Sequence, residues 1–168
     1  VVRVSGDGLP TERFVVMAGL GLDAAVVGEA PANLKARLGW PAYLVSLARN
    51  LSFPAVRVDI SVDGRRPVRH LARMVVVGNV GTLHAGLPLL PDAKPDDGRL
   101  DVVVVAPRRL TDWPSLAWRV IRRSQNRDDR LRHLQGTRVV VRALDPCPRQ
   151  LDGDVVSEGR RLVCEVEP

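Results

Sequence analysis

Acidic residues in two predicted turns offer most of the chemistry that this sequence can support. The first turn, Pro91–Asp101, contains four carboxylates and leads directly into the β-prone run Val102–Val105. The second turn, Leu151–Asp154, lies near the C-terminal end of the sequence. Carboxylates in such turns are suited to binding a hard cation such as Mg²⁺ or to accepting a proton from a substrate.

Asp97 is the candidate metal ligand of the first turn. A tight turn can present this carboxylate together with the backbone carbonyl oxygens of Lys94 and Arg99, and water would complete a near-octahedral shell around Mg²⁺. Asp-Asp-Gly is also a common turn-forming sequence, in which the acids simply face solvent. The spacing alone is compatible with both interpretations.

Asp152 and Asp154 form the candidate catalytic pair. If this stretch is extended, residues i and i+2 point to the same face and the two carboxylates are neighbours. Paired carboxylates suit general-base catalysis or the binding of a Mg²⁺-phosphate group. The alternative is a hairpin with Asp152-Gly153 in its loop. The two interpretations are compatible, because catalytic residues often lie at strand ends.

Strands predominate among the elements that must position these acids. Alternating apolar residues over 56–62 predict a half-buried strand, and Asp63-Gly64 predicts a turn into a partner strand over 68–77. Other strands are predicted near the N-terminus before a turn at 5–10, and over 14–17, 100–106, 138–143, 148–151 and 161–166. Helices are predicted over 32–51, 111–123 and 126–134, with Thr111 or Asp112 as a cap and Gly136 as the terminator. The sequence therefore predicts a mainly β (α+β) fold, mostly antiparallel, with helical insertions in one domain over residues 1–168.

A glycine motif near the N-terminus resembles a dinucleotide-binding loop but lacks its context. Gly19 and Gly21 are followed by Ala24 at the expected spacing, yet no acidic residue follows about 20 residues later. The next segment also has a helical pattern, where such a site requires a strand. We therefore expect these glycines to permit close approach of another chain segment.

The charge and the aromatic content of the sequence limit the kinds of molecule that the protein is expected to bind. The formal net charge is +6, and nearly all the basic residues are arginine, Lys35 and Lys94 being the only lysines. Such a charge suits an anionic membrane, a nucleic acid, or merely an arginine-biased proteome. The aromatic content of 4% disfavours a base-stacking surface, so no nucleic-acid partner is expected. Cys147 and Cys164 are expected to be reduced thiols, with a disulfide between adjacent strands as the alternative.

Taken together, four segments resemble the C-terminal domain of the diacylglycerol kinase catalytic family, which includes bacterial lipid kinases and sphingosine kinases. These segments are Phe14–Ala24, Gly78-Asn79, Leu89–Val102 and Leu151–Asp154. The resemblance covers nearly the whole chain and implies an antiparallel β-sandwich-like domain, the C-terminal half of a two-domain kinase. It also implies transfer of the ATP γ-phosphoryl group to a lipid hydroxyl.

The resemblance implies roles for particular residues. Asp97 and the carbonyls of Lys94 and Arg99 would bind a structural Mg²⁺, and Asp152 and Asp154 would be the catalytic pair. The family usually has Glu at the position of Asp154. The shorter aspartate leaves open which of the two acids accepts the proton.

One motif of the diacylglycerol kinase family is missing from this sequence. The family's N-terminal domain carries a Gly-Gly-Asp-Gly-Thr nucleotide loop, which this sequence lacks. ATP would therefore be bound mainly by a missing N-terminal domain, and the isolated chain is expected to be inactive. A chain that opens at Val1 without a start methionine is expected to be a piece of a longer protein.

Expected partners are that N-terminal domain and a lipid substrate at the membrane surface, with the protein cytoplasmic and peripheral to the membrane. No apolar run is long enough to span a bilayer. The sequence leaves the oligomeric state open, a homodimer included. The competing hypothesis is a non-catalytic β domain that binds anionic lipid or another polyanion.

Overall fold

The structure, a computed structural model, describes residues 1–29, 49–81, 90, 93–94, 96–109, 111–121 and 131–167. Its elements are β1 (Val2–Gly6), β2 (Leu9–Phe14), β3 (Met17–Gly21), α1 (Leu22–Glu29), β4 (Val56–Val62), β5 (Val68–Ala72), β6 (Met74–Gly78), β7 (Leu100–Val105), α4 (Asp112–Ile121), β8 (Leu131–Gly136), β9 (Arg138–Leu151) and β10 (Asp154–Val166).

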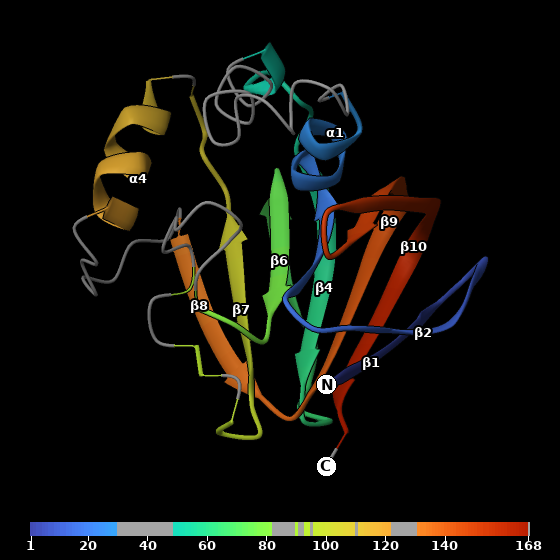
Figure 1. Cartoon of the computed structure of the whole chain (residues 1–168). Coiled ribbons are helices and arrows are strands. Elements are labelled where there is room, and N and C mark those ends of the chain that lie inside the picture. Colours follow the sequence, from blue (N-terminus) through green and yellow to red (C-terminus); the bar gives the residue numbers. More distant parts are fainter. Residues whose placement is uncertain are drawn as a thin grey trace, which may run out of the picture.

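The strands of the described residues form one antiparallel sheet in the order β2-β1-β10-β9-β3-β6-β7-β8, and β4 pairs with both β9 and β5 off this path. Figure 1 shows β7 and β8 on one side of the molecule and β1, β2 and β10 on the other. Because β9 pairs with β10, β3 and β4, it joins the parts of the sheet. The predicted antiparallel, sandwich-like, mainly β fold is confirmed.

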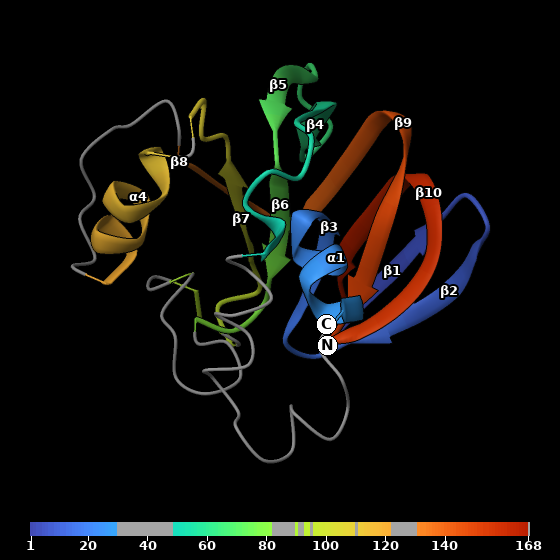
Figure 2. The same ribbon diagram turned by 90° about the horizontal axis from the view of Figure 1, so that it is seen from above.

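Two clusters of buried side chains lie on opposite faces of the central strands. The larger contains residues such as Phe14, Ile60 and Val141 and lies inside the curved sheet. The smaller lies beneath the helices, and α1 contributes Leu22 and Val26 to it. Figure 2 shows α1 next to β3 and β6, with α4 farther along the sheet.

Strand β7 shows how the sequence specifies this arrangement. Every residue of β7 is buried. Leu100, Val102 and Val104 belong to the larger cluster, whereas Val103 and Val105 belong to the smaller one. A strand covered on both faces favours apolar residues at successive positions, which explains the unbroken run Val102–Val105, and Asp101 is the one polar residue of β7.

Several predicted elements require correction. The chain over 131–134 is not helical, because β8 pairs along its whole length with β7. The predicted strand 68–77 is divided at Arg73 into β5 and β6, and β4 pairs only with the first of these. The predicted strands 138–143 and 148–151 are one strand, β9, while 161–166 is the end of β10. The helices predicted over 32–51 lie mostly outside the described residues.

A fully buried arginine joins β9 to β10 where their pairing is irregular. The guanidinium of Arg149 donates hydrogen bonds to the carbonyl oxygens of Ser157, Glu158 and Arg161, at 2.8, 3.0 and 2.9 Å. It also donates to the carbonyl of Asp7, at 2.8 Å. The register of β9 and β10 shifts on both sides of Gly159, so these carbonyls are available to the guanidinium instead of to a regular ladder.

Asp7 completes this network from the turn between β1 and β2. Its carboxylate accepts the backbone N–H groups of Arg160 and Arg161. The hydrogen bond from the Arg160 N–H is the main reason that the pKa of Asp7 lies below its ordinary value, and Arg149 adds to the effect. The turn predicted at 5–10 is present but shorter: it consists of Asp7-Gly8, because 5–6 end β1 and 9–10 begin β2.

Candidate functional site

Sheet register brings distant sequence segments to one edge of the sheet. Met17, which begins β3, is paired with Gly78, which ends β6. Gly78 is also paired with Asp101 near the start of β7, and Ala18 in β3 is paired with Leu151 at the end of β9. Neighbouring antiparallel strands alternate in direction, so the starts of β3 and β7 and the ends of β6 and β9 share this edge.

Asp152 fixes the backbone segment that precedes β3. Its carboxylate accepts three backbone N–H groups, from Val15, Val16 and Met17, at 2.8, 2.8 and 2.9 Å. Its own N–H donates to the Met17 carbonyl at 2.9 Å. These bonds explain why the predicted strand over 14–17 is interrupted: the N–H groups of 15–17 bind a side chain instead of a neighbouring strand.

Asn79 holds the same segment from the other side. Its side-chain amide donates to the Val15 carbonyl at 3.0 Å, and its backbone N–H donates to the Val16 carbonyl at 2.9 Å. Asn79 directly follows β6 and is itself buried. Asp152 therefore holds the three N–H groups of segment 15–17 and the Met17 carbonyl, and Asn79 holds the other two carbonyls of the segment.

A second polar network connects α1 to the turn after β9. The buried amide of Gln150 donates to the carboxylate of Asp23, at 2.7 Å, and accepts the backbone N–H of Gly153, at 2.8 Å. The Asp23 carboxylate occupies the space that a side chain on Gly19 would fill, which confirms the predicted role of this glycine in close approach. Gln150 thus couples the position of the 152–153 turn to α1.

The turn itself is a hairpin turn and is not extended. Asp152 and Gly153 both have positive φ, 47° and 91°, and Asp154 is paired with Leu151 across the turn. These angles are typical of a two-residue hairpin, for which Asp-Gly is a favoured sequence. The i, i+2 argument for neighbouring side chains therefore does not apply here.

The two acids of this turn have different surroundings. Asp152 is half-buried and its carboxylate is engaged by three N–H groups, whereas Asp154 is exposed. Within the described part of the chain, the Asp154 side chain has no hydrogen bond or ion pair. Of the two acids, Asp154 is therefore the one whose carboxylate oxygens face solvent.

Two exposed valines flank these acids. Val15, whose N–H binds Asp152, is 57% exposed, and Val155, which follows Asp154, is 50% exposed. Val155 also lies close to Gly28 of α1. Apolar side chains therefore border the acidic turn and could pack against an apolar partner.

The predicted metal ligands lie in one turn that leads into β7. The N–H of Asp97 donates to the Lys94 carbonyl at 3.4 Å, and the Asp97 carboxylate accepts the N–H of Arg99 at 2.9 Å. Gly98, with φ of 69°, provides the left-handed residue of the turn. All three predicted ligands are exposed and belong to one hydrogen-bonded unit.

This donor set fits a hard cation. It consists only of oxygens, one carboxylate and two carbonyls, with room for water because the turn is exposed. One carboxylate oxygen of Asp97 remains beyond the bond to Arg99. No cluster of three or more His, Cys, Asp or Glu side chains occurs among the described residues, so a cation here would depend on backbone carbonyls.

Sequence reasoning missed the residues that support this edge. Gln150, Asn79 and Asp23 are buried polar residues with specific partners, yet no role was predicted for them. The detectable signal for Gln150 is an amide within a strand immediately before an Asp-Gly turn. Its partner, Asp23, is 127 residues away, and only the sheet register brings the two together.

These features define an antiparallel β-sandwich-like domain whose acid-bearing turns lie at one edge. A model of the family described as the YegS C-terminal NAD kinase beta sandwich-like domain matches residues 15–168. The chain belongs to this family. No curated protein matches it.

Three solved structures that are similar to this chain are kinases by description. A Bacillus anthracis protein provisionally described as a diacylglycerol kinase is 21% identical, with a TM-score of 0.70 over 99% of this chain and 53% of that one. A diacylglycerol kinase from the same bacterium is 18% identical, with a TM-score of 0.61 and coverage of 99% and 50%. Yeast NADH kinase complexed with NADH is 11% identical, with a TM-score of 0.50 and coverage of 99% and 39%.

The chain thus spans about half the length of the diacylglycerol kinases that it resembles. Both thiols are free, as predicted, and the structure also shows that both are buried. Burial raises the pKa of Cys147 to about 11.

Within the described residues, no helix is long and apolar enough to cross a membrane.

Proposed function

We propose that this chain is the C-terminal, acceptor-side domain of an ATP-dependent lipid kinase that phosphorylates the hydroxyl of diacylglycerol or a related lipid. The observation that carries the proposal is the convergence at one sheet edge of the acidic turn 152–154, the segment 15–17 and the turn 94–99. Membership of a kinase-related family supports phosphoryl transfer. The exposed valines beside Asp154 favour an apolar acceptor.

In this proposal the two acids have separate tasks. Asp154, exposed and free of hydrogen bonds within the described residues, accepts the proton of the acceptor hydroxyl. Asp152 acts as a positioning residue, because its carboxylate keeps segment 15–17 and the turn in place. Positioning of this kind lowers the entropic part of the barrier to reaction.

Asp97, with the carbonyls of Lys94 and Arg99, would hold Mg²⁺ near the start of β7. A bound Mg²⁺ supplies positive charge and rigidity to the edge where phosphate is transferred. The nucleotide phosphates would be held by a further domain, since no glycine-rich phosphate loop is present in this sequence. The isolated chain would then be inactive.

The test is an acceptor assay with the full-length protein that its gene encodes. Purified protein is incubated with Mg²⁺ and ATP labelled on the γ-phosphate, and either diacylglycerol in mixed micelles or NAD is supplied as acceptor. We expect label in phosphatidic acid. A matched sample with Asp154→Asn should transfer about 100-fold less, the usual scale for loss of a general base.

Asp145→Asn is the control for this substitution. Asp145 is exposed in β9, away from the turn, and the variant removes the same charge. It should transfer phosphate at the normal rate. Label in NAD and none in any lipid would contradict the lipid kinase proposal and assign the protein to the NAD kinases instead.

A further inference from the structure

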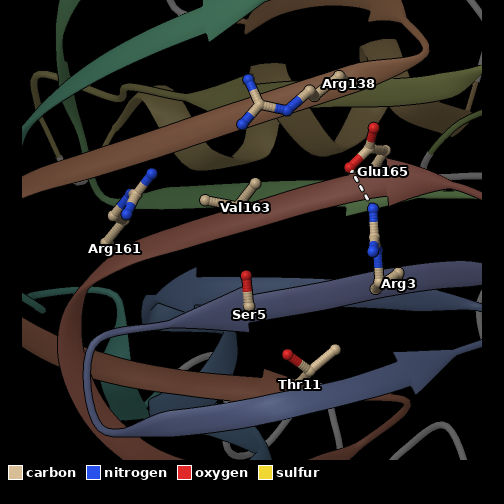
Figure 3. Close-up of a pocket in the computed structure, with 7 residues that line it drawn as sticks. All are labelled: Arg3, Ser5, Thr11, Arg138, Arg161, Val163 and Glu165. Carbon is tan, nitrogen blue, oxygen red and sulfur yellow. Dashed lines mark hydrogen bonds and ion pairs between the residues drawn. The ribbon is translucent and has the colours of Figure 1, made fainter.

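A groove lined by arginines lies on the outer face of the sheet. We call it the arginine groove, and it is lined by Arg3, Ser5, Thr11, Arg138, Arg161, Val163 and Glu165. It encloses about 260 Å³ and is formed by strands β9, β10, β1 and β2. Figure 3 shows Val163 and Ser5 at its centre, with Arg138 on one side and Thr11 on the other.

The arginine groove is separate from the acidic turns. Arg138 is the first residue of β9, whereas the turn that carries Asp152 follows Leu151, the last residue of β9. The lining side chains of β10 alternate with buried Leu162 and Cys164, so they face away from the larger cluster. The groove is therefore on the solvent side, toward one end of β9 and β10.

Positive charge in the groove is only partly compensated. Glu165, the single acid of the lining, is paired with Arg3 at 2.7 Å, a contact drawn in Figure 3. Over the part of the chain that the structure describes, the guanidinium groups of Arg138 and Arg161 have neither a carboxylate nor a carbonyl partner. Two full positive charges thus remain beside the hydroxyls of Ser5 and Thr11.

A further arginine, outside the lining, adds to this excess of positive charge. Arg142 in β9 is the direct register partner of Arg161 in β10, so both side chains leave the same face of the sheet. Like charges directly opposite each other destabilise a sheet, and the described residues give Arg142 no ion partner. Asp59, which is opposite Arg142 in β4, is engaged by Arg69 at 2.9 Å.

We propose that the arginine groove binds a phosphate group of a small anion or a lipid head group. Guanidinium groups bind phosphate oxygens through paired, charge-assisted hydrogen bonds, and hydroxyls can donate further bonds. The volume lies below the roughly 300–1,000 Å³ of pockets for drug-sized ligands, which fits a phosphate group. An anion placed between Arg138 and Arg161 would also relieve the repulsion between Arg161 and Arg142. This inference does not depend on the proposed kinase activity.

The test compares two double variants of the 168-residue chain with equal loss of charge. Arg138→Gln with Arg161→Gln removes the two unpaired arginines of the groove. Arg108→Gln with Arg109→Gln removes two exposed arginines that precede α4 and do not line the groove. Thermal unfolding first confirms that both variants are folded.

Binding is then measured by calorimetry with inorganic phosphate and glycerol 3-phosphate, and by flotation with phosphatidylcholine vesicles that contain or lack phosphatidic acid. We expect the groove variant to bind phosphate groups about tenfold more weakly or worse, and the control variant to bind normally. Binding of glycerol 3-phosphate assigns a free phosphate ester, and binding only to phosphatidic acid vesicles assigns a lipid head group. Equal loss in both variants, or no binding of any probe by the unmodified chain, would overturn the proposal.

Discussion

Asp152 and Asp154 are chemically alike and two positions apart, yet the fold gives them different surroundings. Asp152 accepts three backbone N–H groups at 2.8 to 2.9 Å, while Asp154 is exposed. The sequence predicted both acids as a pair but could not divide their roles. The division depends on segment 15–17, which is more than 130 residues away and reaches the turn only through β3 and β9.

Arg149 carries the first prediction, which concerns a single side chain. Arg149→Met would leave the carbonyls of Ser157, Glu158 and Arg161 without the guanidinium that now satisfies them. Buried polar groups that lose such partners are expected to destabilise the fold by about 3 kcal/mol or more. The measurement is the free energy of unfolding in urea.

Arg160→Met is the control, because Arg160 is exposed in the neighbouring strand β10. Its side chain contributes nothing to the network, since only its backbone N–H binds Asp7. The control should change stability by less than about 0.5 kcal/mol. Equal stability of the two variants would show that the Arg149 network does not support the fold.

At the scale of elements, the sequence predicted strands best where one physical cause determines the pattern. Strand β4 shows the alternation of a half-buried strand, and β7 shows the continuous valines of a strand covered on both faces. Strand β8 was mistaken for a helix, because its sequence LRHLQG has no strict alternation. Its conformation depends on pairing with β7, a tertiary interaction that overrides local preference.

The second prediction belongs to this scale and concerns the turn 94–99. If Asp97 and the carbonyls of Lys94 and Arg99 bind Mg²⁺, the ion should raise the melting temperature of the protein. Mg²⁺ at 100 times its Kd would stabilise the fold by about 2.7 kcal/mol. Asp97→Asn should abolish this increment, which differential scanning calorimetry with and without Mg²⁺ can measure.

Asp96→Asn is the matched control, since Asp96 is the exposed neighbour with the same charge. It should keep the stabilisation by Mg²⁺. An increment that survives in Asp97→Asn but disappears in Asp96→Asn would move the metal site away from the predicted ligands. If both variants keep the stabilisation by Mg²⁺, the metal does not bind in this turn.

At the scale of the whole molecule, β9 explains why one edge collects so many functional candidates. It is paired with β10, β3 and β4, so it fixes the ends of several strands relative to one another. The motif segments predicted from sequence meet at this edge. Sequence alone identified the segments but not the supporting residues Gln150 and Asp23, whose contact follows from the register of β3 with β9.

The chain spans about half of its structural relatives, so a kinase active site would be completed by a facing domain. Val15 and Val155 are exposed beside the acidic turn, and under the proposed function they would face that domain or a lipid acceptor. The arginine groove lies on a different part of the surface. The proposed reaction site and the proposed anion site therefore do not share residues.

The most direct test of the account separates the two acids of the 152–154 turn in the full-length protein. Asp154→Asn and Asp152→Asn are compared for phosphoryl transfer to diacylglycerol and for melting temperature. We predict that Asp154→Asn lowers turnover about 100-fold with an unchanged melting temperature. Asp152→Asn should lower the melting temperature, because an amide can accept fewer of the N–H groups of Val15, Val16 and Met17. A folded Asp154→Asn protein with normal turnover would contradict the account.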